Sequence, residues 1–312
     1  MSDTQFSARE VPWMKLGQSV EGAVTAAEAM ELANLDWEVE MRTAGFQTAN
    51  GSWRVHPGRA AIVRKDTEDP LGSVAKTYEI LQYGDAFDFL DQIHPEYVAA
   101  GSLKNGRQAF LVVKAPEHAR LNAIGNEDPH DLYVVLRTSH DGSRAVEVNL
   151  MPLRHACMNA MPLAGFGTGV GYSGQAQQRW SIRHTAGMHG KLEQAQRVLT
   201  GLDKYAREYT EMAERLAAID LDLEEARKVI AEVTPDYLKG KDKQVDEIMK
   251  VYQNSSRNGF QGTGWGVVNA VDEWNEFYRG GDRRRPETRF LQGLDGSTSR
   301  AVNRTARVLL TR

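Results

Sequence analysis

The chain has 312 residues, of which 41% are hydrophobic and 26% charged, and its formal net charge is −4 at pH 7. This composition is typical of a folded globular protein. A single Cys excludes an internal disulfide, the first residues lack the layout of a signal peptide, and no apolar run approaches the roughly 20 residues that cross a bilayer. We therefore expect a soluble cytoplasmic protein with no membrane partner.

The first third of the chain predicts one helix followed by strands. Thr25 is an N-cap for a helix that runs to about Leu35, because Glu28 stands at the capping-box offset. The apolar period then changes from helical to two, which is typical of strands. Strands are expected over 36–43, 52–58, 60–66 and 71–82, and a short helix over 84–93.

Two hairpins follow. The segment 97–115 has Asn105–Gly106 at its tip, and the segment 131–152 has Asp141–Gly142. Both dipeptides favour the positive φ angles of a type I′ turn, and β-branched residues flank them. The sequence therefore predicts an antiparallel sheet that is rich in hairpins.

The second half of the chain is predominantly helical. Apolar residues step by three and four from Met188 to Leu216, which predicts one long helix after a strand over 179–185. Further helices are expected over 223–233, 245–252 and 264–279, followed by a tail that begins as a loop and forms a helix from Ser297. The predicted fold class is α+β: a hairpin-rich antiparallel sheet packed by a long helix, then a helical subdomain and a basic tail. The expected divisions are 1–205 for the core with a basic groove, 206–280 for the helical subdomain and 281–312 for the Arg-rich C-terminal segment.

Charge is segregated along the chain. Basic residues exceed acidic ones by five in 149–207, acidic residues exceed basic ones by five in 208–250, and basic residues exceed acidic ones by six in 279–312. Such a layout suits a nucleic-acid surface beside a solvated subdomain, and it also fits ordinary patchy surface charge.

Motifs for catalysis, metals or cofactors are weak. The glycines of 165–171 are not followed by the Lys of a phosphate-binding loop, and Cys157 beside His155 reads more readily as a small buried residue than as a nucleophile. Glu127 and Asp128 lie in an acidic stretch that is either solvated or able to bind a hard cation. We therefore assign no catalytic residue, no metal ligand and no cofactor, and do not expect an enzyme.

Nucleic-acid binding has better support, because basic and aromatic residues are interleaved in the α+β segment. Cations hold phosphates, and aromatic faces stack on unpaired bases. The predicted phosphate contacts are Arg137, Arg144, Arg154, Arg179, Arg183 and Lys191, with Lys104 and Arg107 at the rim of the groove; the stacking candidates are Tyr172 and Trp180.

Four stretches, "GSVAKTYEILQYGDAFDFLD", "SHDGSRAVEVNLMPLRHACMN", "RHTAGMHGKLEQAQ" and "GTGWGVVNAVDEWNEFY", occur in this order. Together they resemble the phage/plasmid-like proteins grouped as a domain of unknown function, which are carried on bacteriophages, prophages and plasmids. In that family Arg154, Cys157 and Asn159 would form a recurring signature without an assigned catalytic role. The resemblance implies a mobile-element protein in the host cytoplasm.

The architecture is also similar to single-strand annealing proteins of the Red-beta, RecT and Erf kind. We therefore expect a single-stranded DNA-binding and annealing protein that acts in recombination or replication as a homo-oligomeric ring or filament, with a phage exonuclease or a host protein as a further partner. Two alternatives remain open. One is a protein–protein interaction module that acts on a host system through the acidic helices, and the other is a metal-dependent nuclease that uses Glu127 and Asp128.

Overall fold

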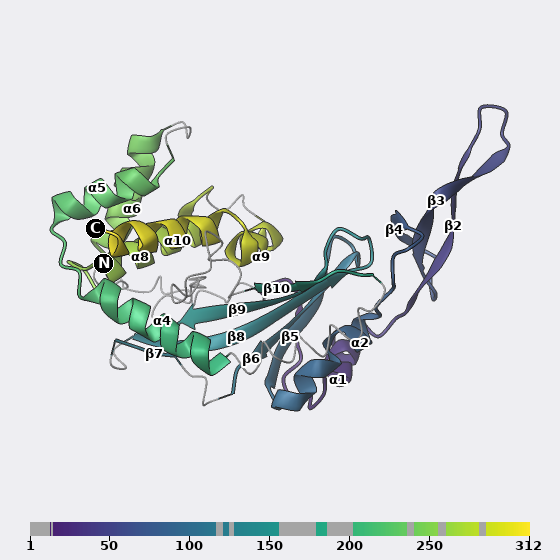
Figure 1. The fold of residues 1–312 in the computed structure, drawn as a ribbon, viewed down its shortest axis with the longest axis horizontal. Coiled ribbons are helices and arrows are strands. Elements are labelled where there is room, and N and C mark those ends of the chain that lie inside the picture. The colour runs from purple at the N-terminus through teal and green to yellow at the C-terminus, as the bar shows by residue number, and fades with distance from the viewer. Residues whose placement is uncertain are drawn as a thin grey trace, which may run out of the picture.

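The computed structural model describes residues 13, 15–116, 121–124, 128–155, 179–185, 202–235, 240–254, 260–280 and 285–312. The structure combines antiparallel sheets with helices, most of which follow the last strand in the chain, and this confirms the predicted α+β class. The main sheet lies in the middle of the molecule, the helices that follow the last strand gather at one end, and a thin hairpin projects from the other end (Figure 1).

The main sheet is antiparallel throughout the described residues. Its strand order is β1-β5-β6-β8-β9-β10, and β7 pairs with β8 at the side of this path. The strands are β1 (Gln18–Ser19), β5 (Glu96–Leu103), β6 (Gln108–Lys114), β7 (Leu121–Ala123), β8 (Asp128–Ser139), β9 (Val146–Arg154) and β10 (Arg179–Ile182).

Both predicted hairpins of this sheet are confirmed. Asn105 and Gly106 have φ angles of 58° and 81°, as their turn requires, and Leu103 pairs with Gln108 across the β5–β6 hairpin. The β8–β9 hairpin closes through a longer connection, so that Arg137 pairs with Glu147. The expected strand over 179–185 is β10 and lies next to β9.

A second sheet forms the projecting arm, which we define as residues 39–64. It contains β2 (Val39–Gln47) and β3 (Trp53–Arg64), and β4 (Pro70–Ala75) pairs only with the half of β3 nearest the main sheet. The expected strands over 52–58 and 60–66 are one strand. Pro57 is tolerated inside it because the pairing with β2 is interrupted there: Ala60 pairs with Thr43 and Val55 with Gly45. The strand expected over 71–82 ends at Ala75.

The helices fall into two groups. The first group is α1 (Ala26–Leu32), with Thr25 as the predicted N-cap, then α2 (Tyr83–Phe87) and the 3₁₀ helix η1 (Asp88–Ile93). The second group is α4 (Leu202–Ala217), α5 (Leu223–Val233), α6 (Lys241–Tyr252), α8 (Gly264–Glu273), the π-helical turn η4 (Trp274–Tyr278), α9 (Pro286–Asp295) and α10 (Ser297–Leu310).

The helical predictions for the C-terminal part need two corrections. Residues 286–295 of the tail, expected in a loop, form α9 (Pro286–Asp295), with Pro286 at the first helical position. The apolar spacing predicts Tyr278 on one helical face with Val267, Val271 and Trp274, but these three are buried whereas Tyr278, the last residue of the π-helical turn, is 43% exposed. The first half of the expected long helix lies outside the described residues, and α4 is its second half.

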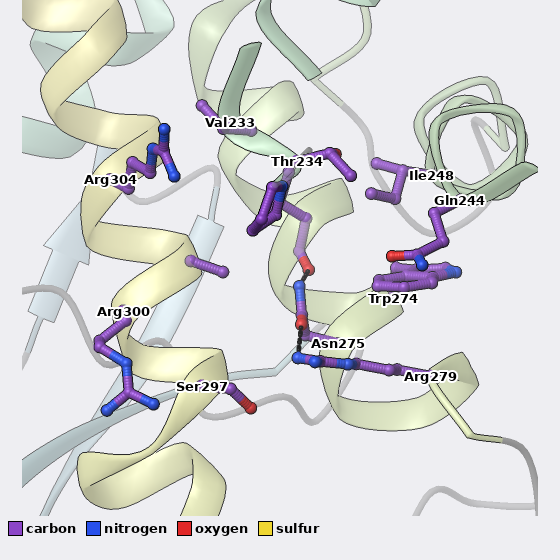
Figure 2. Close-up of a pocket in the computed structure, with 13 residues that line it drawn as sticks. Val233, Thr234, Gln244, Ile248, Trp274, Asn275, Arg279, Ser297, Arg300 and Arg304 are labelled. Atoms are coloured by element: carbon purple, nitrogen blue, oxygen red, sulfur yellow. Dashed lines mark hydrogen bonds between the residues drawn. The ribbon is translucent and has the colours of Figure 1, made fainter. Parts of the chain in front are cut away.

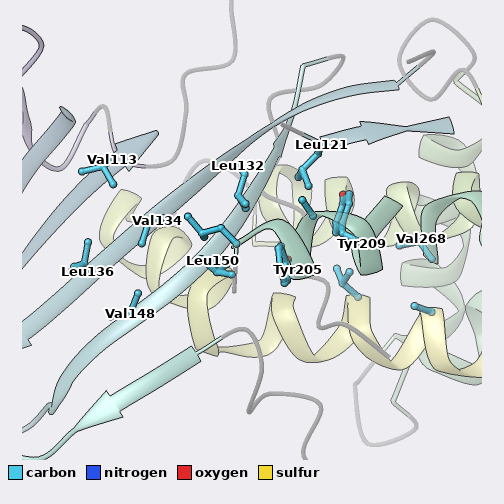
Figure 3. Close-up of a cluster of buried hydrophobic side chains, with 14 of the residues drawn as sticks. Val113, Leu121, Leu132, Val134, Leu136, Val148, Leu150, Tyr205, Tyr209 and Val268 are labelled. Atoms are coloured by element: carbon cyan, nitrogen blue, oxygen red, sulfur yellow. The ribbon is translucent and has the colours of Figure 1, made fainter. Parts of the chain in front are cut away.

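Apolar side chains cover both faces of the main sheet. One face carries Val134, Leu136, Val148 and Leu150, which join α1, α2, α4 and α8 in one large core (Figure 3). The opposite face carries Phe110, Val112 and Leu153, which pack against Trp13 and α9. Since the same core includes α5, α6 and α10, the second group of helices is packed onto the sheet rather than tethered to it. Within the described residues, none of the helices combines the length and apolarity that a bilayer crossing demands.

Candidate nucleic-acid interface

Arg137 is buried within the main sheet. It lies directly opposite Glu147 on the neighbouring strand, its Nη2 donates to Glu147 Oε2 over 2.7 Å, and the two side chains are 1% and 3% exposed. A buried charged pair is costly to open, because each partner would lose its counter-ion while still out of water. The structure therefore corrects the expectation that Arg137 contacts phosphate: it is part of the sheet's interior.

Arg154 and Asp128 form a second buried pair at the other end of the same strands. Arg154 Nε donates to both carboxylate oxygens of Asp128, over 2.7 and 2.8 Å, and Trp265 Nε1 of α8 donates to Asp128 Oδ2 over 2.8 Å. We call Asp128, Arg154 and Trp265 the sheet–helix lock, since they join β8 and β9 to α8. The structure therefore also corrects the expectation that Arg154 contacts phosphate.

The sheet–helix lock also contains Asp128, one of the two residues of the expected nuclease site. Asp128 is 1% exposed and its carboxylate already accepts hydrogen bonds from two side chains, so it is buried and engaged rather than open to a solvated cation. Glu127 lies outside the described residues, and among the described ones no group of three His, Cys, Asp or Glu residues could hold a metal ion. Cys157 and Asn159 of the expected signature also lie outside that part of the chain.

The remaining basic candidates gather at one end of the main sheet. Strand register places the β5–β6 tip, the β8–β9 connection and the end of β10 side by side, because Gln108 pairs with Ser139 and Ile182 with Val146. We call the side chains carried there the root patch: Lys104, Arg107, Arg144 and Arg183. Arg144 lies 3.5 Å from Glu147 Oε1, and the other three are exposed.

Four further candidates are not placed as side chains. Arg179 and Trp180 lie on β10 opposite Asn149 and Val148, but only their backbone is described. Tyr172 and Lys191 lie outside the described residues, so their roles stay predictions.

The arm exposes a concentration of apolar surface that the sequence reasoning did not select. Trp53, Phe46 and Val55 are 61%, 55% and 52% exposed. Exposed large side chains at such density mark an interaction surface. Trp53 is held in place, since Gly45 lies beneath it: a Cβ at Gly45 would come within 2.6 Å of the indole ring. The available signal was Trp53 beside Arg54, with Phe46 nearby, in a stretch without Asp or Glu.

The charge of the arm is entirely positive over most of its length. Residues 41–61 contain Arg42, Arg54 and Arg59 and no Asp or Glu. Arg42 pairs with Glu40 at the edge of this stretch, and Arg59 donates to Ser73 of β4. Arg54 has no hydrogen bond or ion pair with any described residue; it is exposed and lies directly across from Phe46.

A cluster of aromatic and histidine rings fixes the arm to the main sheet. His140 stacks on Tyr83 with ring centroids 3.9 Å apart, and His184 stacks on Tyr78 at 4.8 Å. Tyr78 also donates its hydroxyl to the Ser139 carbonyl over 2.7 Å, and Trp37, which leads into the arm, packs edge-on against Tyr83. The base of the arm is therefore fixed by this cluster of packed rings, which lies beside the root patch.

Because His140 is buried in this ring cluster, we expect the free energy of unfolding to decrease in acid. Burial, with a smaller effect of neighbouring His184, lowers the pKa of His140 to about 3 from an unfolded value of 6.5. The unfolded chain binds the proton first, so this contribution to stability is complete above pH 6.5 and is lost as the pH falls through the folded pKa. Between pH 6.5 and 4 the loss is on the order of 3 kcal/mol. Urea unfolding across this range should show a shallower pH dependence for His140→Phe, whereas exposed His56→Gln should match the parent; equal slopes for all three would contradict the assignment.

These features define a class: an α+β protein with a two-sided antiparallel sheet, a packed helical half and a projecting basic–aromatic arm. A family model described as a domain of unknown function (DUF932) matches residues 70–307, and the chain belongs to this family. The match starts at β4, so the whole arm, residues 39–64, lies before it. Comparisons with curated proteins and with solved structures found no match.

Proposed function

We propose that the protein binds single-stranded DNA along the arm and the root patch, and that it promotes annealing of complementary strands as a homo-oligomer. The observation that carries the proposal is the arm's exposed pairing of aromatic and guanidinium groups on a stretch without carboxylates. Unpaired bases present apolar π-faces beside a phosphate in every nucleotide, so this surface complements a single strand in both respects.

The shape of the arm favours an unpaired strand over duplex. Phe46 and Arg54 lie directly opposite each other on neighbouring strands, and Trp53 lies on the opposite face of the ribbon. Both faces thus offer a ring at the end of a thin hairpin (Figure 1). A duplex hides its base faces in the stack, whereas a single strand can lay successive bases on such rings.

The root patch extends the same path toward the main sheet. The β8–β9 connection lies close to β4: a Cβ added at Gly142 would come within 3.1 Å of Val74, and one added at Gly72 would come within 2.6 Å of Asp141. Lys104, Arg107 and Arg183 therefore stand where the arm joins the sheet, within reach of a strand that leaves the arm. Their role is to hold phosphates, which adds affinity without base specificity.

The family context supports annealing as the biological use. The ordered motifs resemble proteins of phages and plasmids, and the sequence pattern of hairpins followed by helices led us to expect a likeness to annealing proteins of the Red-beta, RecT and Erf kind. This likeness of architecture also motivates the proposal of rings or filaments.

An anisotropy titration of the full chain with a labelled single-stranded oligonucleotide tests the proposal. We expect binding at low salt, weaker binding to the matching duplex, and an affinity that falls with salt by a logarithmic slope of roughly 0.7 per phosphate contacted. Faster annealing of complementary oligonucleotides in the presence of the protein would support the second half of the proposal. No binding at low salt would end it and favour the protein-interaction alternative.

A further inference from the structure

A cavity of about 310 Å³ lies within the helical half, far along the chain from the arm. Its size falls within the range of roughly 300–1,000 Å³ that small-molecule sites occupy. Helix α10 forms one wall, and α8 with the turn η4 forms the opposite wall (Figure 2). Val233 and Thr234 at the end of α5, together with Gln244 and Ile248 of α6, complete the lining.

The lining is basic although its surroundings are acidic. Arg279, Arg300 and Arg304 line the cavity, and none of its thirteen lining residues is Asp or Glu. The segment 208–250, which supplies α5 and α6, has twelve acidic and seven basic residues. Carboxylates are thus plentiful on these helices but absent from this surface, which favours an anion there.

Arg279 is positioned by a short chain of hydrogen bonds. Its Nη1 donates to Asn275 Oδ1 over 3.1 Å, and Asn275 Nδ2 donates to the Val271 carbonyl over 2.8 Å (Figure 2). Asn275 belongs to η4, and π-helical turns are rare and occur frequently at functional sites. The π turn carries Trp274 and Asn275 on the cavity wall and leads directly into Arg279.

The cavity wall opposite Arg279 is formed by the first part of α10. Gly296 is the N-cap of α10 and has no side chain that could accept hydrogen bonds from the first N–H groups of the helix. Ser297 follows on the cavity wall, and its buried hydroxyl has no hydrogen-bond partner among the described residues. Uncapped N–H groups, an unpaired hydroxyl and Arg300 one turn later form a set of donors that all favour a negative group.

We propose that this cavity binds a phosphate monoester. Its phosphate would lie between Arg279, Ser297 and the guanidinium groups of α10, where planar guanidinium groups suit its oxygens. The apolar part of the lining, formed by Val233, Ile248 and Val271, would contact the organic group that carries the phosphate. The site is independent of the arm, so its ligand is a small molecule and not the bound strand.

Calorimetric titration of the full chain at constant ionic strength tests the site with three probes: inorganic phosphate, a nucleoside 5′-monophosphate and the same nucleoside without phosphate. We expect saturable binding of the two phosphates and none of the nucleoside. Tighter binding of the monophosphate would identify an organic phosphate as the ligand, whereas equal affinities would identify phosphate itself. No saturable binding of either phosphate at about 10 mM would overturn the proposal.

Variants distinguish the cavity from general surface charge. Arg279→Gln and Arg304→Gln should each weaken phosphate binding at least tenfold, since each removes a donor from the lining. Arg307→Gln is the matched control, because Arg307 is exposed on the same helix and does not line the cavity. Equal losses in all three variants would also overturn the proposal. Oligonucleotide binding by the arm should be unchanged in Arg279→Gln, so failure of one proposal leaves the other intact.

Discussion

Asp128→Ala should destabilise the fold by roughly 3–5 kcal/mol, because it leaves the Arg154 guanidinium buried without its counter-ion. The same change removes the acceptor of Trp265 Nε1, which ties α8 to the sheet. Arg154 is 2% exposed, so water does not replace the lost contacts. Urea unfolding of parent and variant measures the difference.

An exposed ion pair provides the control for the sheet–helix lock. Asp246 pairs with Arg227 between α5 and α6, and both side chains are about half exposed. Asp246→Ala should cost at most about 1 kcal/mol, since water solvates the remaining partner. The double variant Asp128→Leu with Arg154→Met should recover part of the loss, because it removes both buried charges. A cost below about 1 kcal/mol for Asp128→Ala would show that the lock is not a stabilising contact.

Changing Trp53→Ala and Arg54→Gln together should weaken binding of single-stranded DNA by roughly 10- to 100-fold. Stacking on one aromatic ring contributes about 1–3 kcal/mol per base, and the guanidinium adds a phosphate contact. Trp53 and Arg54 are exposed at the far end of the arm, so the free energy of unfolding should not change. Anisotropy titration at fixed salt measures the affinity.

The matched control lies on α5. Leu223 is 56% exposed and Arg227 has a half-exposed side chain, so Leu223→Ala with Arg227→Gln removes a similar apolar group and one positive charge far from the arm. This control should leave the affinity nearly unchanged. If both double variants weaken binding equally, the arm is not the interface.

Local signals in the sequence were sufficient for many elements. The Asn105–Gly106 turn predicted both the β5–β6 hairpin and its register, because a two-residue turn pairs Leu103 with Gln108. Asp222 caps α5 with a complete capping box, and Pro235 follows its end, so both limits of this helix could be predicted. The apolar face of α10, with Val302, Ala306 and Leu309, is buried as its spacing indicated.

It was harder to predict which arginines are exposed at the interface, because their burial depends on the register between neighbouring strands. A two-residue turn at Asp141–Gly142 would pair Arg137 with Val146, whereas the longer connection pairs it with Glu147. A shift of one residue exchanges the faces of a strand, and here it places Arg137 beside a carboxylate. Burial of Arg154 depends on α8, which is more than a hundred residues away in the chain.

Neither the arm nor the cavity was predicted from the sequence, and the reasons differ. The residues of the arm were recognised as strands, but Pro57 suggested two short segments rather than one long projecting ribbon. Two short segments gave no indication that Trp53 and Phe46 would both be exposed on one ribbon. The cavity combines side chains from α5, α6, η4 and α10, and no local pattern brings them together.

Photo-cross-linking tests directly whether single-stranded DNA binds along the arm and the root patch. A single-stranded oligonucleotide that carries 4-thiothymidine is bound to the full chain at low salt, irradiated, and the adducts are mapped on peptides. We expect adducts mainly within the arm, residues 39–64, with a second group at Lys104, Arg107 and Arg183. Adducts confined to the helices from Leu202 onward, with none in the arm, would contradict it.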